Sequence, residues 1–407
     1  MTTPTHNLTL IKWLTFMMFM MFAMTTDAVG VIIPVIIEEF DLSMTAAGAF
    51  HYAPMAAIAL SGILLGFLAD KLGRKKTIII GLCVFAIACG LFAIGNTFSF
   101  FLFLLILSGL AIGIFKTGAL ALVGDISRST GEHTRTMNAV EGFFGVGAII
   151  GPFIVTYLLT AGISWKYLYI IAGVICSALC IIAALVQYPH TQKKAEEPIN
   201  LKRTMKMMNN KFALGFSTAI ALYVGTEAAI YVWMPTLLSK YEGSAVWLAT
   251  YALTIFFVLR ASGRFLAVWI LKKISWEVAM LTFSGAIFIC YLFSMIFGLE
   301  VAVYLLPLSG LFMSMIYPTL NSKGISCFHK SEHGAVAGVI LFFTAVAASV
   351  GPLVMGAFSD LMGGHAKYGF YIATLFAALL FVGMLYNWLR KPAEAILLAQ
   401  DYSEYEH

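Results

Sequence analysis

Twelve apolar windows follow one another along this chain, and each is long enough to cross a lipid bilayer as a helix. A transmembrane helix needs roughly 20 mostly apolar residues, because it must span about 30 Å of hydrocarbon. The windows lie near residues 11–37, 46–69, 77–96, 99–123, 137–160, 166–187, 213–239, 245–271, 276–298, 302–326, 334–358 and 367–389. With 61% hydrophobic and 11% charged residues, the composition excludes a disordered chain and a secreted disulfide scaffold. The sequence therefore predicts an all-α polytopic membrane protein with twelve transmembrane helices.

Basic residues mark one side of this membrane protein. Of the 25 Lys and Arg residues, 18 fall in the segments that share a side with the N-terminus. The opposite side has only Lys166, Lys240 and Lys367, and its first loop, at 38–41, reads Glu-Glu-Phe-Asp. By the positive-inside rule, both termini should be cytoplasmic, and we expect a multi-pass protein of a bacterial inner membrane. The same rule accounts for the net charge of +5, so no nucleic-acid partner is needed.

A polar, Lys-rich segment at 188–212 divides the windows into two sets of six. Such a composition suits a linker between bundles. We expect an N-terminal six-helix bundle at 1–187, this cytoplasmic linker, and a C-terminal six-helix bundle with a short cytoplasmic tail at 213–407.

The two halves are similar to each other at an offset of 200 or 201 residues. Four short matches fall in helices of the same rank in each half. They are Leu107–Leu110 with Leu308–Leu311, Gly151-Pro152 with Gly351-Pro352, Lys166-Tyr167 with Lys367-Tyr368, and Ser61-Gly62 with Ser262-Gly263. Two six-helix bundles related by an axis along the membrane normal are the parallel-repeat plan of alternating-access transporters.

Ionisable residues inside the predicted spans are candidates for function, because each costs about 2.5–3.5 kcal/mol on insertion scales unless it faces a partner or water. They are Asp27, Glu141, Glu227, Lys116, Arg260 and Lys323. The repeat offset pairs Asp27 with Glu227 and Lys116 with Tyr317. We predict that three of them, Asp27, Glu141 and Glu227, exchange protons during transport.

The predicted substrate contacts combine these charges with aromatic and amide side chains. They are Asp27, Lys116, Glu141, Glu227, Trp233, Arg260, Tyr317 and Asn321. Two alternatives remain open at this stage. Lys116 could pair permanently with Glu141 or Asp27 and only hold its bundle together, and Arg260 and Lys323 could lie toward the cytoplasmic ends and snorkel.

The loop between the second and third spans carries a recognisable motif. Residues 66–77 read Gly-Phe-Leu-Ala-Asp-Lys-Leu-Gly-Arg-Lys-Lys-Thr. This run resembles the loop motif of the major facilitator superfamily almost throughout. The resemblance implies the twelve-helix fold of that superfamily and a cytoplasmic latch made by Gly66, Asp70, Gly73 and Arg74, in which Asp70 would accept hydrogen bonds while the cytoplasmic side is closed.

Three further segments resemble the fucose/glucose-galactose:proton symporter branch of this superfamily. They are Thr26-Asp27 through Pro34, Tyr223–Glu227 through Trp233, and Met313–Thr319. The resemblance implies that Asp27 carries a proton and that Glu227, Trp233 and Tyr317 contact substrate. It also implies that the first and fourth helices of each half line a central cavity.

One position departs from that branch. Lys116 stands in the fourth helix where the fucose carrier of the branch has an acid, and Glu141 in the fifth helix could restore the carboxylate. Alternatively, Lys116 binds an anionic or zwitterionic solute such as a sugar acid, an amino acid or a carboxylate metallophore.

The fifth span contains several glycines before a proline, at 142, 145, 147, 151 and 152. This pattern resembles the glycine-proline motif of proton-driven exporters in the superfamily. Glycines at such spacing also occur wherever membrane helices pack closely.

Together these features predict a proton-coupled secondary active transporter of a small polar organic solute, with sugars or sugar-like compounds first. Sodium in place of protons is possible, and the partners would be the solute, the coupling ion and the lipid bilayer, with the monomer as the functional form. The alternatives are a proton-driven exporter of drugs or metabolites and a non-transporting receptor or lipid-handling protein, against which the loop motif argues. No cofactor or metal is expected. Enzymatic activity is not expected either, because the chain lacks a metal-spaced His set, a nucleophile motif and a phosphate-binding loop.

Overall fold

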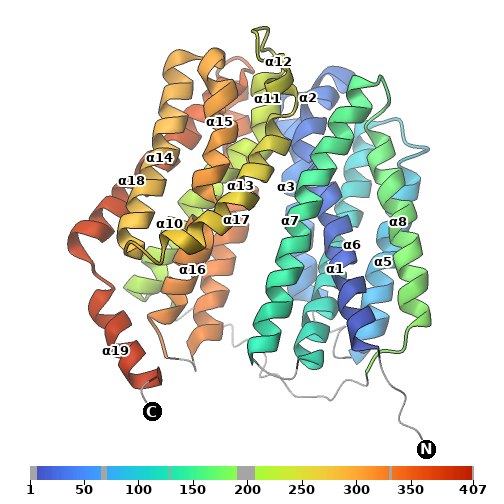
Figure 1. The fold of residues 1–407 in the computed structure, drawn as a ribbon. Helices are drawn as coiled ribbons and strands as arrows, with labels where there is room; N and C mark the ends of the chain where they lie inside the picture. Colours follow the sequence, from blue (N-terminus) through green and yellow to red (C-terminus); the bar gives the residue numbers. More distant parts are fainter. Residues whose placement is uncertain (1–6, 66–70, 128–129, 190–206, 330–331, 406–407) are drawn as a thin grey trace, which may run out of the picture. The chain divides into compact units, whose positions relative to one another are not determined.

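The computed structural model describes the chain except residues 1–6, 66–70, 128–129, 190–206, 330–331 and 406–407 (Figure 1). The described regular structure is helical throughout. Contacts divide the chain into two compact units, Met1–Lys194 and Ala195–His407, which we call the first and second units. Their boundary falls inside the segment 188–212 that the sequence assigns to a linker.

The first unit contains six membrane-spanning segments. Its helices are α1 (Leu8–Thr26), α2 (Val29–Phe40), α3 (Met44–Leu65), α5 (Arg74–Leu91), α6 (Phe98–Ile126), α7 (Thr130–Thr160) and α8 (Lys166–Leu185). The pair α1 and α2 together makes the first span.

The second unit contains six more spans and a C-terminal helix. Its elements are α10 (Lys211–Ala228), the π-helical turn η1 (Ala229–Trp233), α11 (Met234–Leu238), α12 (Val246–Thr250), α13 (Ala252–Ile270), α14 (Trp276–Phe297), α15 (Leu299–Met313), α16 (Ile316–Ser326), α17 (His333–Leu361), α18 (Ala366–Arg390) and α19 (Glu394–Tyr405). Among the described residues, nine segments are long and apolar enough to cross a membrane. Helices α3, α5 and α13 fill the second, third and eighth places, and the predicted twelve-helix architecture is confirmed.

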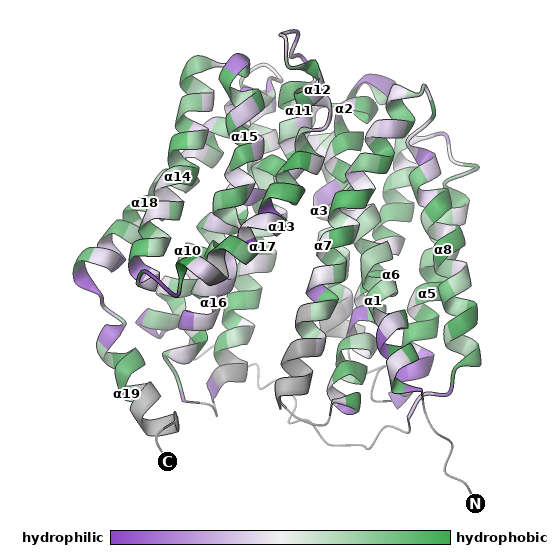
Figure 2. Ribbon diagram, in the orientation of Figure 1, coloured by the Kyte–Doolittle hydropathy of each residue, from purple (hydrophilic) through white to green (hydrophobic). Residues whose placement is uncertain are grey.

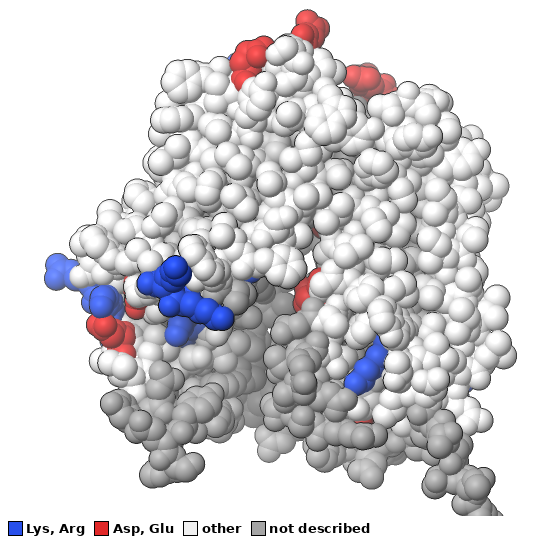
Figure 3. Space-filling model, in the orientation of Figure 1, with Lys and Arg blue, Asp and Glu red and all other residues white. Residues whose placement is uncertain are grey.

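Apolar side chains cover the outside of both units as well as their cores. Large residues such as Phe265 and Leu361 are each 83% exposed, which would be unfavourable in water and is expected in lipid. Figure 2 shows hydrophobic residues along most of each helix. On the face drawn in Figure 3, acidic side chains lie at the upper ends of the helices, and the basic ones lie toward the lower ends with some acidic side chains beside them, while most of the surface between carries no charge.

Helix pairing confirms that the two halves are structural repeats. In the first unit the closest pairs are α1 with α7, α3 with α6, α5 with α6, α5 with α8, and α1 with α8. The same ranks pair in the second unit: α10 with α17, α13 with α15, α14 with α15, α14 with α18, and α10 with α18. The offset read from the sequence therefore corresponds to a repeated packing arrangement.

The matched glycines lie at these crossings. A Cβ added to Gly109 on α6 would meet the carbonyl oxygen of Pro54 on α3 at 2.5 Å, and one added to Gly310 on α15 would meet that of Phe256 on α13 at the same distance. No side chain fits at either crossing, which explains why the Leu-Ser-Gly-Leu match is retained in both halves.

Three spans predicted as continuous are interrupted, and this corrects the windows at 11–37, 213–239 and 302–326. The first breaks at Asp27, between α1 and α2; the seventh contains η1; the tenth breaks between α15 and α16. The interruptions of the seventh and tenth spans come just before Pro235 and Pro318, because a proline cannot donate a backbone hydrogen bond and clashes with the carbonyl four residues earlier. Pro34 lies inside α2, seven residues after Asp27, and does not coincide with the first interruption.

Candidate functional site

Asp27 lies at the interruption of the first span, where it caps the end of α1. Its backbone N–H still donates to the carbonyl of Ala23 at 3.1 Å, but the helix does not continue regularly beyond it. The hydroxyl of Thr26 donates to Asp27 Oδ2 at 3.1 Å. The side chain is half-buried, so a carboxylate with a defined partner lies near the middle of a 33-residue span.

Lys116 projects from α6 in the same unit. Its ammonium lies 5.3 Å from the ring centre of Phe144 on α7, a cation–π distance. The carboxylates of Glu141 and Asp27 both act on this ammonium electrostatically. Within the described part of the chain, Lys116 and Glu141 form no direct ion pair, and Glu141 is exposed. The structure therefore brings the three predicted residues of this unit into one electrostatic group.

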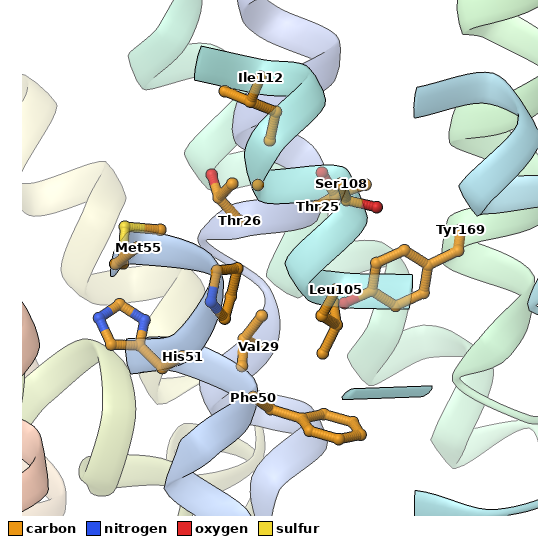
Figure 4. Close-up of a pocket in the computed structure, with 12 residues that line it drawn as sticks. Thr25, Thr26, Val29, Phe50, His51, Met55, Leu105, Ser108, Ile112 and Tyr169 are labelled. Atoms are coloured by element: carbon orange, nitrogen blue, oxygen red, sulfur yellow. The ribbon is translucent and has the colours of Figure 1, made fainter. Parts of the chain in front are cut away.

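A small pocket with a mostly apolar lining lies between α1, α2, α3, α6 and α8 (Figure 4). Its volume is about 310 Å³, including the part open to solvent, and Thr26 forms part of its lining. The hydroxyls of Ser108 and Tyr169 are buried at its wall and have no hydrogen-bond partner among the described residues. The lining is therefore mostly apolar, with the hydroxyls of Thr26, Ser108 and Tyr169 among its polar groups near the Thr26–Asp27 pair.

Glu227 forms the corresponding site in the second unit. Its Oε1 lies 2.8 Å from Nη2 of Arg260 on α13, and the two side chains are 8% and 25% exposed. The hydroxyl of Tyr223, one helical turn earlier, lies 2.8 Å from the same Oε1 and 3.0 Å from the carbonyl oxygen of Met313. Arg260 thus pairs with a carboxylate inside the unit, as required of a buried charge.

The π-helical turn η1 begins two residues after Glu227 and rotates the next residues relative to an α-helix. Trp233, at its end, is buried, and its indole N–H donates to the carbonyl of Pro352 on α17 at 3.1 Å. Tyr291 on α14 donates to the carbonyl of Thr226 at 2.7 Å. Trp233 and Tyr291 therefore hold the irregular segment against neighbouring helices.

Tyr317 lies just after the interruption of the tenth span. Its ring centre is 6.4 Å from that of Tyr223, so it is adjacent to the Glu227 group. Asn321 and Lys323 follow on α16 and are half-buried. Whether Asn321, Trp233 or Tyr317 contacts substrate stays a prediction.

Tyr223 and Tyr291 are the residues that sequence reasoning underrated. Tyr223 reads as a packing ring, yet its position four residues before Glu227 puts both on one face of α10, and this spacing could have indicated the contact. Tyr291 reaches Thr226 from another helix, and nothing in the sequence indicates that pairing.

The glycines of α7 divide into two kinds. A Cβ on Gly147 would collide with the carbonyl oxygen of Met20 on α1, and one on Gly151 with that of Met24. In contrast, a Cβ on Gly142 or Gly145 would meet nothing within 4 Å. Gly147 and Gly151 are therefore needed for the close contact between α7 and α1, the helix that ends at Asp27. This contact explains part of the glycine pattern of the fifth span by packing.

This difference predicts the outcome of matched substitutions. We expect Gly151→Ala to destabilise the protein by about 1–3 kcal/mol, as overpacking does, because the methyl group would push α1 and α7 apart. Gly145→Ala should be neutral or slightly stabilising, since alanine favours the helix. Thermal melting of both purified variants in detergent measures the difference, and equal melting temperatures would contradict the packing role.

The predicted cytoplasmic latch is described only in part. Gly66 and Asp70 lie outside the described residues. Gly73 has φ +85° at the N-cap of α5, a conformation that favours glycine. Arg74 Nε lies 2.9 Å from Asp125 Oδ2 at the end of α6, and Arg74 is buried.

Lys75 forms a second interhelical contact at the same end of the unit. Its ammonium donates to the carbonyls of Ala184 and Val186 at 2.7 and 2.8 Å, and these oxygens terminate α8. Arg74 and Lys75 together join the ends of α5, α6 and α8. The sequence did not single out Asp125 as the partner of Arg74.

Comparisons with known proteins agree with this architecture. The sequence model of the Major Facilitator Superfamily matches residues 15–352. The quinolone resistance protein NorA of Staphylococcus aureus is 26% identical over 362 residues, which cover 85% of this chain and 89% of NorA. A glucose/galactose transporter of Brucella abortus is 22% identical over 368 residues, which cover 86% of this chain and 88% of that protein.

Solved structures with the same fold include two transporters. The nucleoside transporter NupG has a TM-score of 0.71 at 16% identity, covering 93% of this chain and 98% of NupG. The Escherichia coli fucose:proton symporter FucP has a TM-score of 0.62 at 21% identity, covering 92% of this chain and 98% of FucP.

Proposed function

Because the chain belongs to the major facilitator superfamily, we propose that it is a proton-coupled secondary active transporter that moves a small polar organic solute by alternating access. Sugars or sugar-like compounds are the first candidates. The protein would act as a monomer in a bacterial plasma membrane with both termini in the cytoplasm. The two units would be the bundles that rock against each other around the solute.

The charge balance of the first unit carries this proposal. Two carboxylates, Asp27 and Glu141, share one ammonium, Lys116. Asp27 is half-buried and Glu141 is exposed, so the two carboxylates differ in their access to water. The proton affinity of a carboxylate near an ammonium changes when its access to water changes, so this group suits uptake and release of a proton during the transport cycle.

The second unit supplies a balanced pair that suits solute binding. The contact between Glu227 and Arg260 is neutral as a whole and also engages Tyr223. A polar solute could exchange hydrogen bonds with these three side chains without leaving a buried charge unpaired. We predict that Asp27 and Glu227, equivalent by the repeat, both exchange protons during transport.

Accumulation in proteoliposomes tests the proposal. With the outside acidified, vesicles containing the protein should concentrate at least one labelled compound from a panel of sugars, amino acids and organic acids. Collapsing the proton gradient should abolish this accumulation, while the compound should still equilibrate across the vesicle membrane. The Lys116→Ala variant separates solute classes: it should retain transport of a neutral sugar better than transport of an anion, because the ammonium is the group that would bind a carboxylate.

Export of drugs or metabolites is the second candidate function. Its support is the similarity to the quinolone resistance protein NorA, which has the higher identity of the two relatives described above. This alternative predicts that everted vesicles concentrate hydrophobic cations when their interior is acidic, and that no sugar, amino acid or organic acid in the panel is taken up.

A further inference from the structure

A groove runs along the exposed side of the second unit between α10 and α18. Its volume is about 710 Å³, including the part open to its surroundings, and most of its lining is apolar or small. The α10 side runs from Lys211 to Leu222, and the α18 side from Leu379 to Met384. At 1.5 Å per residue, the α10 side is roughly 16 Å long, which is about half of the roughly 30 Å hydrocarbon core and hence the depth of one leaflet.

Two glycines keep this groove open. A Cβ added to Gly215 on α10 or to Gly383 on α18 would meet nothing within 4 Å. Unlike Gly147 and Gly151, these glycines are therefore not needed for helix contact. Their missing side chains instead leave room along the groove for something that is not part of the described chain.

The groove has hydrogen-bond donors at one end. Lys211 lies there, exposed, and within the described residues no carboxylate pairs with its ammonium. Asn387 lies one turn beyond Gly383 on α18, so it marks the same end of the groove on that helix. An ammonium at the mouth of an apolar groove suits an anionic oxygen ligand attached to a hydrocarbon chain.

Exposed aromatic residues place these donors at the level of lipid headgroups. Tyr386 and Trp388 flank Asn387 and are 59% and 39% exposed. Tyr and Trp concentrate at the membrane–water interface, where an amphipathic ring is favoured. The donors thus lie at headgroup depth, and the apolar part of the groove extends from them into the leaflet.

We propose that this groove binds one anionic glycerophospholipid, with the phosphate at Lys211 and an acyl chain between α10 and α18. The positive-inside pattern assigns this end of α10 to the cytoplasmic leaflet, in which anionic lipids attract basic residues at membrane surfaces. The proposal is independent of the transported solute.

Native mass spectrometry of the purified full chain, titrated with phosphatidylglycerol or phosphatidylcholine, tests the site. Wild-type protein should retain one phosphatidylglycerol at least fivefold more strongly than phosphatidylcholine. Lys211→Gln should reduce that preference about fivefold, the effect of one basic residue near a membrane surface. Gly383→Leu should remove retention of both lipids, because its side chain would fill the groove.

Gly90→Leu is the matched control, since Gly90 is an exposed helical glycine on α5 whose Cβ would also meet nothing within 4 Å. It should bind lipid as wild type does. Melting temperature and monodispersity of each variant check that it is folded. Equal retention of the two lipids by wild type, or unchanged retention in folded Gly383→Leu protein, would overturn the proposal.

Discussion

Replacing Asp27 with asparagine should abolish proton-driven accumulation while leaving the protein folded. With a gradient of one pH unit, transport of one proton per solute can sustain up to about a tenfold concentration ratio, because one pH unit corresponds to about 1.4 kcal/mol. Asparagine keeps the size of the side chain and can accept the hydrogen bond from Thr26, but it cannot exchange a proton. The expected ratio for Asp27→Asn is therefore about one.

Equilibration of the same solute across the membrane is the internal control. Exchange of labelled for unlabelled solute requires the alternating-access motion but no net proton movement, so Asp27→Asn should retain it. Glu141→Gln is the matched comparison, since Glu141 is the other carboxylate that acts on Lys116. If Asp27→Asn still accumulates solute tenfold and Glu141→Gln does not, the coupling proton belongs to Glu141.

Removing Arg260 alone should be among the most destabilising single changes in the second unit. Arg260→Met would leave the carboxylate of Glu227, 8% exposed, without its cation. Breaking a buried pair in this way costs about 3–5 kcal/mol, and the lower end applies here because Arg260 is 25% exposed. The double variant Glu227→Gln/Arg260→Met should recover most of the loss, because no buried charge then remains unpaired.

Unfolding free energies of the two single variants and the double variant, measured in detergent with a denaturant, give the coupling energy directly. Tyr223→Phe is the matched control: it removes one hydrogen bond to Glu227 but leaves the ion pair, so it should cost about 1–2 kcal/mol. Additive effects of the Glu227 and Arg260 changes would show that the contact at 2.8 Å does not hold the unit together.

The global architecture follows from features that sequence records well. Lipid requires every span to satisfy its own backbone hydrogen bonds, so apolar length alone predicts the number of helices. The repeat could also be predicted, because glycines at helix crossings tolerate no side chain: Gly109 and Gly310 mark the same crossing in the two units. The sequence also indicates Asp27, Lys116 and Glu141 as interacting charges, because charges inside spans must find one another or water; their role in transport stays a prediction.

The local irregularities could not be predicted with the same rules. Pro235 and Pro318 follow interruptions, whereas α2, α7 and α17 contain Pro34, Pro152 and Pro352 and remain continuous. The irregular segments are also held by side chains from other helices, as when Tyr291 donates to the carbonyl of Thr226. Contacts between helices, such as that of Arg74 with Asp125, likewise depend on how each helix is rotated about its own axis. The apolar windows of the sequence do not determine this rotation.

The central claim is that solute and protons move together through this protein, with Asp27 as the carrier. The direct measurement is the pH of a weakly buffered suspension of proteoliposomes when the transported solute is added outside. We expect a rise in external pH that is proportional to solute uptake and absent in Asp27→Asn. Uptake by wild-type protein with no change in pH, or uptake that requires a sodium gradient instead, would contradict the claim.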